Sequence, residues 1–261
     1  MTEKPITFNR QEALRYFRAR SGDEDAEALV DAAYEKLKNE LQPRYTVKRC
    51  GCRAGGNTVT LENGTVFRSK ALARYVGGAK ELFLFGATLG SRVDTALRRM
   101  AVTSVAAAGA GQAVAAALIE TYCDDCCDLL RQKLPEGQML KWRFSPGYGD
   151  WSLEEQKLLF PVLDCARTIG LTLTESCMMA PVKSVTAVMA IEETAAEGKR
   201  EKSPGKTRPE QGIPGPDTGC GDGSPGADLS GGTESKCRRC GKTDCEFRTK
   251  FFETASGKRE L

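Results

Sequence analysis

The chain has 261 residues, with 38 Lys and Arg against 35 Asp and Glu, so its formal net charge is +3. This near-neutral charge predicts no nucleic-acid binding, which would need basic residues clustered on one face. The sequence contains no histidine, which excludes Ser-His-Asp and Cys-His nucleophile systems and leaves only sulfur or oxygen ligands for any metal.

The number of cysteines and the N-terminal sequence indicate the cellular compartment in which the protein is expected to lie. Eleven cysteines are present, an odd number, and the chain opens MTEKPITFNRQ without the apolar run of a secretory signal. We therefore expect thiols or metal ligands in place of disulfides, and a cytoplasmic location. The weakly polar run at 101–119 is mostly Ala and Gly. It lacks the Leu and Ile content of a membrane span, so we expect a buried helix and no membrane association.

The sequence pattern over residues 9–41 predicts two helices. Asn9 can cap the first helix, with Glu12 three residues later, and Gly22 separates the first helix from the second. Pro43 follows the end of the pattern. The second helix has an apolar stripe at spacings of three and four, formed by Ala26, Val30, Ala33, Leu37 and Leu41.

The pattern then changes to that of strands. The run at 58–69 folds at Asn63-Gly64, a dipeptide that accepts the backbone of a tight hairpin turn. The later predicted elements, in chain order, are a helix over 69–75, a strand over 82–87, one long or two consecutive helices over 91–134, a strand over 138–144, a helix after the Ser152/Glu155 capping box, and β-rich runs at 171–174 and 184–191. Because helices and strands do not alternate regularly, we predict an α+β fold, with mixed helices around an antiparallel-rich sheet.

Two patterns that resemble ligand sites are better explained by helix packing. Cys123, Cys126 and Cys127 share one face of a predicted helix, which is typical of small residues turned to a core. The Gly109-Ala-Gly111 run matches a dinucleotide fingerprint only loosely, because a helix and not a strand precedes it.

The composition changes at about residue 195. Residues 195–235 contain 10 Gly and 5 Pro. Because this segment has few apolar side chains to bury, burial cannot offset the entropy lost when its backbone is ordered. We therefore predict a domain over 1–194, a flexible linker over 195–235 and a small cysteine-rich tail over 236–261.

The tail carries the clearest local metal-binding pattern. Cys237, Cys240 and Cys245 have C-x2-C-x4-C spacing, and Cys220 is the nearest thiol for a fourth ligand. Three such thiolates can hold an iron-sulfur cluster or zinc. The alternative is a thiol-rich tail that binds no metal.

The stretch from Arg143 to Trp151, RFSPGYGDW, predicts a ligand pocket. A strand leads into a turn that contains Ser145, Gly147 and Tyr148, and the glycines allow a ligand or another backbone to approach closely. Arg143 can grip a carboxylate through two parallel hydrogen bonds. The alternative is a structural turn with Arg143 on the surface.

At this motif the chain resembles a known family. RFSPGYGDW, followed by Glu155-Gln156 and by IGLTLTESCMMAPVKSVTA at 169–187, is similar to the activation domain of vitamin B12-dependent methionine synthase. ATLGSRVDTALRR at 87–99 fits the same family. The likeness covers about residues 10–192 and is nearer to the short stand-alone proteins that carry only this domain. In the family the turn is commonly followed by Pro, Ala and Cys, whereas this chain has Gly149-Asp150-Trp151.

The resemblance implies an S-adenosylmethionine-binding protein that reactivates cobalamin on a partner. The partner is methionine synthase or another corrinoid protein, and an electron donor reduces the cobalt while S-adenosylmethionine supplies a methyl group. By the same resemblance, Arg143 holds polar groups of the ligand, and the backbone at Ser145, Gly147 and Tyr148 lines the adenosine. Glu120 is a candidate partner for the ligand amine or ribose. No residue is expected to be catalytic in the ordinary sense.

Two other functions are consistent with the same sequence. One is a self-sufficient S-adenosylmethionine-dependent methyltransferase, which would need a general base. The other is an iron-sulfur or zinc redox carrier, in which the cysteine tail is the functional part and the large domain only docks a partner. If the tail holds an iron-sulfur cluster, the linker would let it approach the corrinoid as an electron source.

Overall fold

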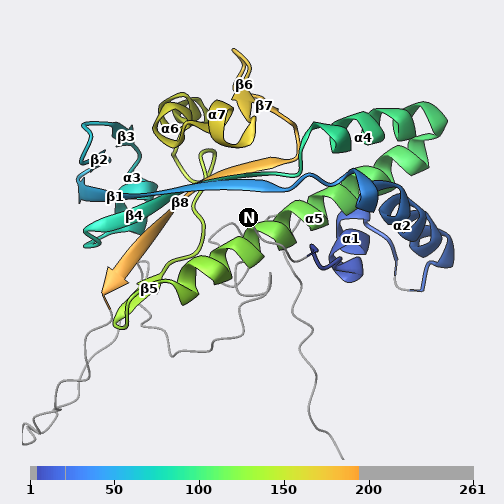
Figure 1. Cartoon of the computed structure of the whole chain (residues 1–261), viewed down its shortest axis with the longest axis horizontal. Helices are drawn as coiled ribbons and strands as arrows, with labels where there is room; N and C mark the ends of the chain where they lie inside the picture. Colours follow the sequence, from blue (N-terminus) through green and yellow to red (C-terminus); the bar gives the residue numbers. More distant parts are fainter. Residues whose placement is uncertain (1–4, 21, 194–261) are drawn as a thin grey trace, which may run out of the picture. The chain divides into compact units, whose positions relative to one another are not determined.

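The computed structural model describes residues 5–20 and 22–193. The predicted linker over 195–235 and the cysteine tail over 236–261 lie outside the described residues. Within the described part, a six-stranded sheet has the order β3-β2-β1-β4-β8-β5, and every neighbouring pair is antiparallel (Figure 1). The α+β prediction is confirmed.

The strands are mostly those that the sequence predicts. Their bounds are β1 (Arg44–Gly55), β2 (Thr58–Leu61), β3 (Val66–Arg68), β4 (Glu81–Thr88), β5 (Gln138–Leu140) and β8 (Ser184–Glu193), with β6 (Thr172–Leu173) and β7 (Met179–Ala180) forming a separate pair. The strand predicted over 138–144 ends early at Leu140. Beyond it, the chain keeps contact with β8 through an isolated bridge between Phe144 and Val188.

The helices surround this sheet. Their bounds are α1 (Arg10–Phe17), α2 (Glu24–Leu37), α3 (Lys70–Val76), α4 (Ser91–Thr103), α5 (Val105–Gln132), α6 (Gln156–Leu163) and α7 (Cys165–Ile169), with short 3-10 turns η1 (Lys38–Glu40) and η2 (Leu153–Glu155). Asn9 caps α1 by accepting a hydrogen bond from the Glu12 amide, as the sequence predicts. The run over 91–134 is two helices that meet at Ser104, whose hydroxyl caps α5.

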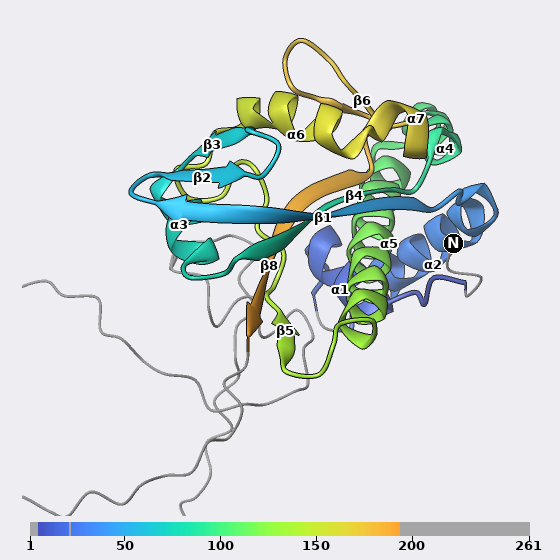
Figure 2. The same cartoon turned by 60° about the vertical axis from the view of Figure 1, so that its left-hand side comes forward.

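Two hydrophobic cores pack against the sheet. Figure 1 and Figure 2 show α6 and α7 on one face of the sheet and α5 on the other. The first core joins the sheet to α1, α2, α4 and α5, and the second joins it to α3, α6 and α7. Strand β4 serves both, since Phe83 and Phe85 belong to the first core while Leu82 and Leu84 belong to the second. This alternation is the two-residue period of a strand that is covered on both faces.

Helix α5 is the long element of the first core. Cys123, Cys126 and Cys127 are buried on it, as predicted. Gly111 allows close packing against α4, because a Cβ at this position would lie 2.9 Å from Met100 Cε and 3.0 Å from Leu97 Cδ2. Within residues 5–20 and 22–193, no helix combines the length and the apolar character needed to cross a membrane.

Candidate functional site

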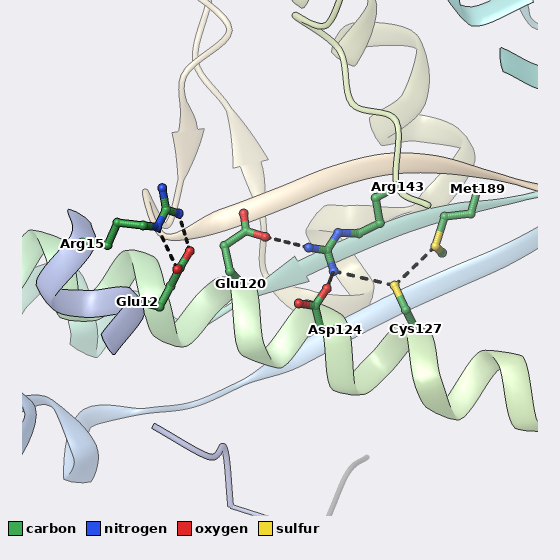
Figure 3. Close-up of polar contacts among 7 residues, drawn as sticks. All are labelled: Glu12, Arg15, Glu120, Asp124, Cys127, Arg143 and Met189. Carbon is green, nitrogen blue, oxygen red and sulfur yellow. Dashed lines mark hydrogen bonds and ion pairs between the residues drawn. The ribbon is translucent and has the colours of Figure 1, made fainter. Parts of the chain in front are cut away.

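Arg143 lies on the edge of the sheet, just after β5. The backbone on its C-terminal side is held to β8, because Phe144 N donates to Val188 O at 2.9 Å and Val188 N donates to Phe144 O at 2.8 Å. Phe144 belongs to the second core. The side chain of Arg143 extends instead toward α5 (Figure 3).

On α5 the guanidinium of Arg143 meets two carboxylates one helical turn apart. Its Nη2 donates to Glu120 Oε2 at 2.6 Å, and its Nη1 forms an ion pair with Asp124 Oδ1 at 3.0 Å. Nη1 also donates to Cys127 Sγ at 3.7 Å. Residues four apart on a helix share a face, so α5 presents these groups as one row.

The burial of this cluster is uneven. The Arg143 side chain is only 8% exposed, whereas the side chains of Glu120 and Asp124 are 33% and 36% exposed. Burial by itself lowers the pKa of Arg143, but the neighbouring Cys123 thiol and the two carboxylates outweigh it and raise the pKa above its usual value. The two carboxylates are therefore partly exposed to solvent, and the charged guanidinium that pairs with both of them is buried.

Helix α1 brings a second acid–base pair to the same region. Arg15 donates to the buried Glu12 carboxylate, from Nε at 2.9 Å and from Nη2 at 2.5 Å. Burial, followed by the negative charges of Glu120 and Glu12, raises the pKa of Tyr16, which keeps its phenol neutral. Figure 3 shows the α1 pair beside the α5 row.

The glycine-rich turn follows Phe144. Gly147 N donates to Trp151 O at 2.7 Å, and Tyr148 N donates to Ser145 O at 3.1 Å. Gly147 and Gly149 both have positive φ, which other residues rarely adopt. The Tyr148 ring is half exposed and packs edge-on against Phe144, at 5.8 Å between ring centroids.

Asp150 fastens this turn to α3. Its carboxylate accepts hydrogen bonds from Ser69 Oγ, Lys70 N and Ala71 N, at 2.5, 2.9 and 2.9 Å. Gly149 makes the close approach possible, since a Cβ there would lie 2.7 Å from Ala71 Cβ. Gly149 and Asp150, which differ from the pattern of the family that the sequence resembles, therefore have a structural role in this contact.

The Asp150 contact is expected to make stability depend on pH in acid. The Ser69 hydroxyl, and then the Ala71 and Lys70 amides, lower the pKa of Asp150 from 3.8 to about 2. A carboxyl whose folded pKa is depressed stabilises the fold above its unfolded pKa and loses this contribution as the pH falls toward its folded pKa. We expect Asp150→Asn to lower the melting temperature by a constant amount above pH 4, and the deficit to shrink between about pH 4 and pH 2.

Thermal melts of wild type and Asp150→Asn across this pH range measure the effect. Asp128→Asn, which removes an exposed carboxylate of α5, is the control. A deficit that stays the same down to pH 2 would argue against an ionic role for Asp150.

The expected capping box at Ser152 and Glu155 does not form. Ser152 accepts from Glu154 N, but the Glu155 carboxylate accepts instead from Arg68 N, at 2.9 and 3.0 Å, and from Trp151 Nε1 at 2.7 Å. This prediction was wrong because the Glu155 carboxylate has tertiary partners, the backbone amide of Arg68 and the indole of Trp151, in place of the local amide.

Two cavities of the described part lie away from Arg143. One, of about 410 Å³, is lined by Gln42, Arg44, Gly90, Ser91, Asp94, Arg98, Ile169, Gly170, Ala180 and Pro181. The other, of about 370 Å³, is lined by residues of 157–173. Neither includes Glu120, Arg143 or Tyr148. A ligand at the α5 row would therefore lie against a surface of the protein and not inside either cavity.

The metal-binding prediction concerns Cys220, Cys237, Cys240 and Cys245, which all lie outside the described residues. Among residues 5–20 and 22–193 there is no group of three or more Cys, Asp or Glu arranged to hold a metal ion. The seven cysteines of this part are free thiols.

The structure brings two of the five predicted ligand residues together, Glu120 and Arg143, which lie 23 positions apart in the sequence. Ser145, Gly147 and Tyr148 form the adjoining turn. The alternative of a structural turn with Arg143 on the surface is wrong in its placement of Arg143, because this side chain is buried against α5. Asp124 and Glu12 were not predicted, although the spacing of four from Glu120 to Asp124 was visible in the sequence.

Comparison with known proteins agrees with this architecture. Residues 122–199 match the family profile described as vitamin B12 dependent methionine synthase, activation domain. No curated protein matches the chain. The crystal structure of the MetH reactivation domain bound to AdoHcy superposes with a TM-score of 0.52 at 18% sequence identity, covering 71% of this chain and 70% of that one. The resemblance inferred from the sequence is thereby confirmed, and this chain has the fold of the vitamin B12-dependent methionine synthase activation domain.

Proposed function

We propose that the chain binds S-adenosylmethionine and assists the reactivation of a cobalamin-dependent methionine synthase or a related corrinoid methyltransferase. The observation that carries the proposal is the pair of half-buried carboxylates, Glu120 and Asp124, held by the buried Arg143. The shared fold supports it, as does the AdoHcy bound to the reactivation domain of similar structure.

The charges of the α5 row fit the ligand. S-adenosylmethionine carries two positive groups, a sulfonium and an ammonium, and one carboxylate. The solvent-facing acids Glu120 and Asp124 suit the positive groups, because opposite charges attract strongly where water is partly excluded. Bound there, S-adenosylmethionine would supply a transferable methyl group.

This arrangement changes the role expected for Arg143. A guanidinium has five N–H donors, and the contacts with α5 are made by its two terminal nitrogens. We therefore assign Arg143 chiefly to fixing the positions of Glu120 and Asp124. A carboxylate of the ligand would have to share the guanidinium with them.

The turn after Phe144 is the proposed place for the adenosine. Ser145 and Gly147 offer backbone groups, and the absence of a side chain at Gly147 lets a flat base approach. The half-exposed ring of Tyr148 supplies a face for stacking, and it is steadied by its edge-on contact with Phe144.

The cobalamin and the electron would come from other proteins. A corrinoid protein docked on this face would meet the methyl group of the ligand, and a separate donor would reduce its cobalt. The thiols of Cys237, Cys240 and Cys245, with Cys220, remain a predicted iron-sulfur or zinc site. Only an iron-sulfur cluster there would serve as that donor, because zinc has no redox chemistry.

Calorimetric titration with S-adenosylmethionine tests the proposal. We expect Glu120→Gln to weaken binding by roughly tenfold or more, because a hydrogen bond to a charged group contributes about 1.5–3 kcal/mol. The matched control is Glu136→Gln, an exposed carboxylate beyond the end of α5, which should bind as wild type does.

Two results would contradict the proposal. If wild type does not bind S-adenosylmethionine, the redox-carrier alternative is left. If Glu120→Gln binds as tightly as wild type, the α5 row is not the site. Binding without capture of a corrinoid protein in a pull-down would favour the self-sufficient methyltransferase.

A further inference from the structure

The larger cavity, of about 410 Å³, lies where the first residues of α4 meet the end of α7 and the chain that follows β7. The start of β1 completes its lining, and Figure 2 shows α4 beside α7. Its volume is in the usual range for a small-molecule site. Because Glu120, Arg143 and Tyr148 do not line it, any ligand that it holds is distinct from the one proposed for the α5 row.

The lining of this cavity has an apolar part and a cationic part. Ile169 and Pro181 are buried side chains, so they form its floor. Arg44 and Arg98 are exposed side chains, so they stand at its rim, together with the hydroxyl of Ser91. Such a lining suits a molecule that has an anionic head group and an apolar body.

The two arginines of the rim lack carboxylate partners. Among the residues that the structure describes, the Arg44 side chain makes no hydrogen bond and no ion pair. The Arg98 guanidinium donates only to the Thr95 hydroxyl of its own helix, at 3.2 Å. These residues come from different elements, β1 and α4, and line one cavity. Both guanidinium groups therefore have donors left for a ligand.

The one acid of the lining, Asp94, does not neutralise them. Asp94 lies four residues before Arg98 on α4, a spacing at which ion pairs commonly form. Its Oδ2 instead accepts from Val182 N at 2.9 Å, and its Oδ1 is buried. The Asp94 carboxylate thus holds the chain after β7 against α4. The cavity keeps two cations at its rim, against one carboxylate that is turned to the backbone.

We propose that this cavity binds a small organic phosphate. The phosphate lies between Arg44 and Arg98, and the organic group lies on Ile169 and Pro181. A phosphate monoester has three terminal oxygens and a charge near −2, so it can accept from two guanidinium groups and from the Ser91 hydroxyl. A carboxylate has only two oxygens, and the fork of a single arginine can occupy both of them.

Titration of the full-length protein with 1-naphthyl phosphate, followed by the fluorescence of the naphthyl group, tests the proposal. At about pH 7.5 the phosphate is mostly a dianion. We expect saturable binding to wild type, and a loss of roughly three- to tenfold in Arg44→Gln and in Arg98→Gln. The loss stays in this range because exposure weakens a charge-assisted hydrogen bond. The control is Arg92→Gln, an arginine of α4 that pairs with Glu40 and does not line the cavity, and it should bind as wild type does.

Three further probes separate the parts of the ligand. 1-Naphthol lacks the phosphate, 1-naphthoate has a carboxylate in its place, and inorganic phosphate lacks the apolar body. We expect each of them to bind more weakly than 1-naphthyl phosphate, with 1-naphthol at least roughly tenfold weaker. If any of them binds as tightly, the assignment to an organic phosphate is overturned. It is also overturned if wild type does not bind 1-naphthyl phosphate, or if the arginine variants bind it as wild type does.

The outcome is independent of that for the α5 row. The double variant Arg44→Gln/Arg98→Gln should lose 1-naphthyl phosphate and still bind S-adenosylmethionine with the affinity of wild type. Glu120→Gln should show the reverse pattern. A wild type that binds 1-naphthyl phosphate but not S-adenosylmethionine would contradict the proposed function alone. Loss of both ligands in the double variant would mean that the two sites are not separate, and would overturn this inference.

Discussion

Replacing Trp151 with alanine is expected to lower the free energy of unfolding by about 3–5 kcal/mol, the usual range for a large aromatic residue removed from a core. Trp151 is almost fully buried, packs edge-on against Phe67 at 5.5 Å and stacks near Phe144 at 6.0 Å. It also donates from Nε1 to Glu155. Its loss would leave a cavity in the second core and a carboxylate without one of its donors.

Urea denaturation followed by circular dichroism measures this loss. Trp151→Phe should be less damaging than Trp151→Ala, because a ring remains and only part of the volume and the hydrogen bond are removed. Leu153→Ala, at an exposed position two residues on, should change stability by less than about 0.5 kcal/mol. A loss below about 1 kcal/mol for Trp151→Ala would mean that this core is far less tightly packed than described.

Arg143→Ala is expected to destabilise the fold by about 2–3 kcal/mol, somewhat less than is usual when one partner of a wholly buried ion pair is removed. The discount applies because Glu120 and Asp124 are each about a third exposed, and water can solvate the charges that remain. The two acids would nevertheless lose the guanidinium that contacts both of them across one turn of α5.

A comparison of variants separates this charge effect from lost packing. Asp124→Asn added to Arg143→Ala should recover part of the stability, since it removes one of the two carboxylate charges that lose this guanidinium. Arg131→Ala, which breaks the exposed pair with Asp128, should cost less than about 0.5 kcal/mol. Equal losses for Arg131→Ala and Arg143→Ala would contradict the structural role given to Arg143.

The local features of the fold were predictable because their causes are local. The Asn9 cap, the turn at Asn63-Gly64 and the buried stripe of α2 depend on residues within a few positions of one another. The three cysteines of α5 were assigned to the core from helical spacing alone, and they are buried there.

The direction of the Arg143 side chain was not predictable from its neighbours in the sequence. It depends on the pairing of Phe144 with Val188, 44 positions later, and on α5 lying beneath the sheet. The sequence shows that Arg143 follows a strand, but it does not show on which face of the sheet the Arg143 side chain lies. Once the face is known, Glu120 and Asp124 are the acids it meets.

The same limit explains Glu155 and Asp150. The sequence predicted a local role for Glu155, as a capping residue, and showed Asp150 only as part of a departure from the family pattern. Their partners, Arg68 N for Glu155 and Lys70 N for Asp150, lie 87 and 80 positions earlier in the chain. Carboxylates of this kind make contacts that only the assembled fold defines.

The place of β8 in the sheet also constrains how the protein folds. β1, β2, β3 and β4 are joined by short connections and can pair as soon as they are made, but β4 must wait for β8, about 100 residues later, before its other edge is covered. Pairing across so long a stretch of chain is slow, and until it occurs the apolar edge of β4 is open to intermolecular association. Synthesis and refolding should therefore pass through a state with a bare edge strand, and aggregation during refolding should increase steeply with protein concentration.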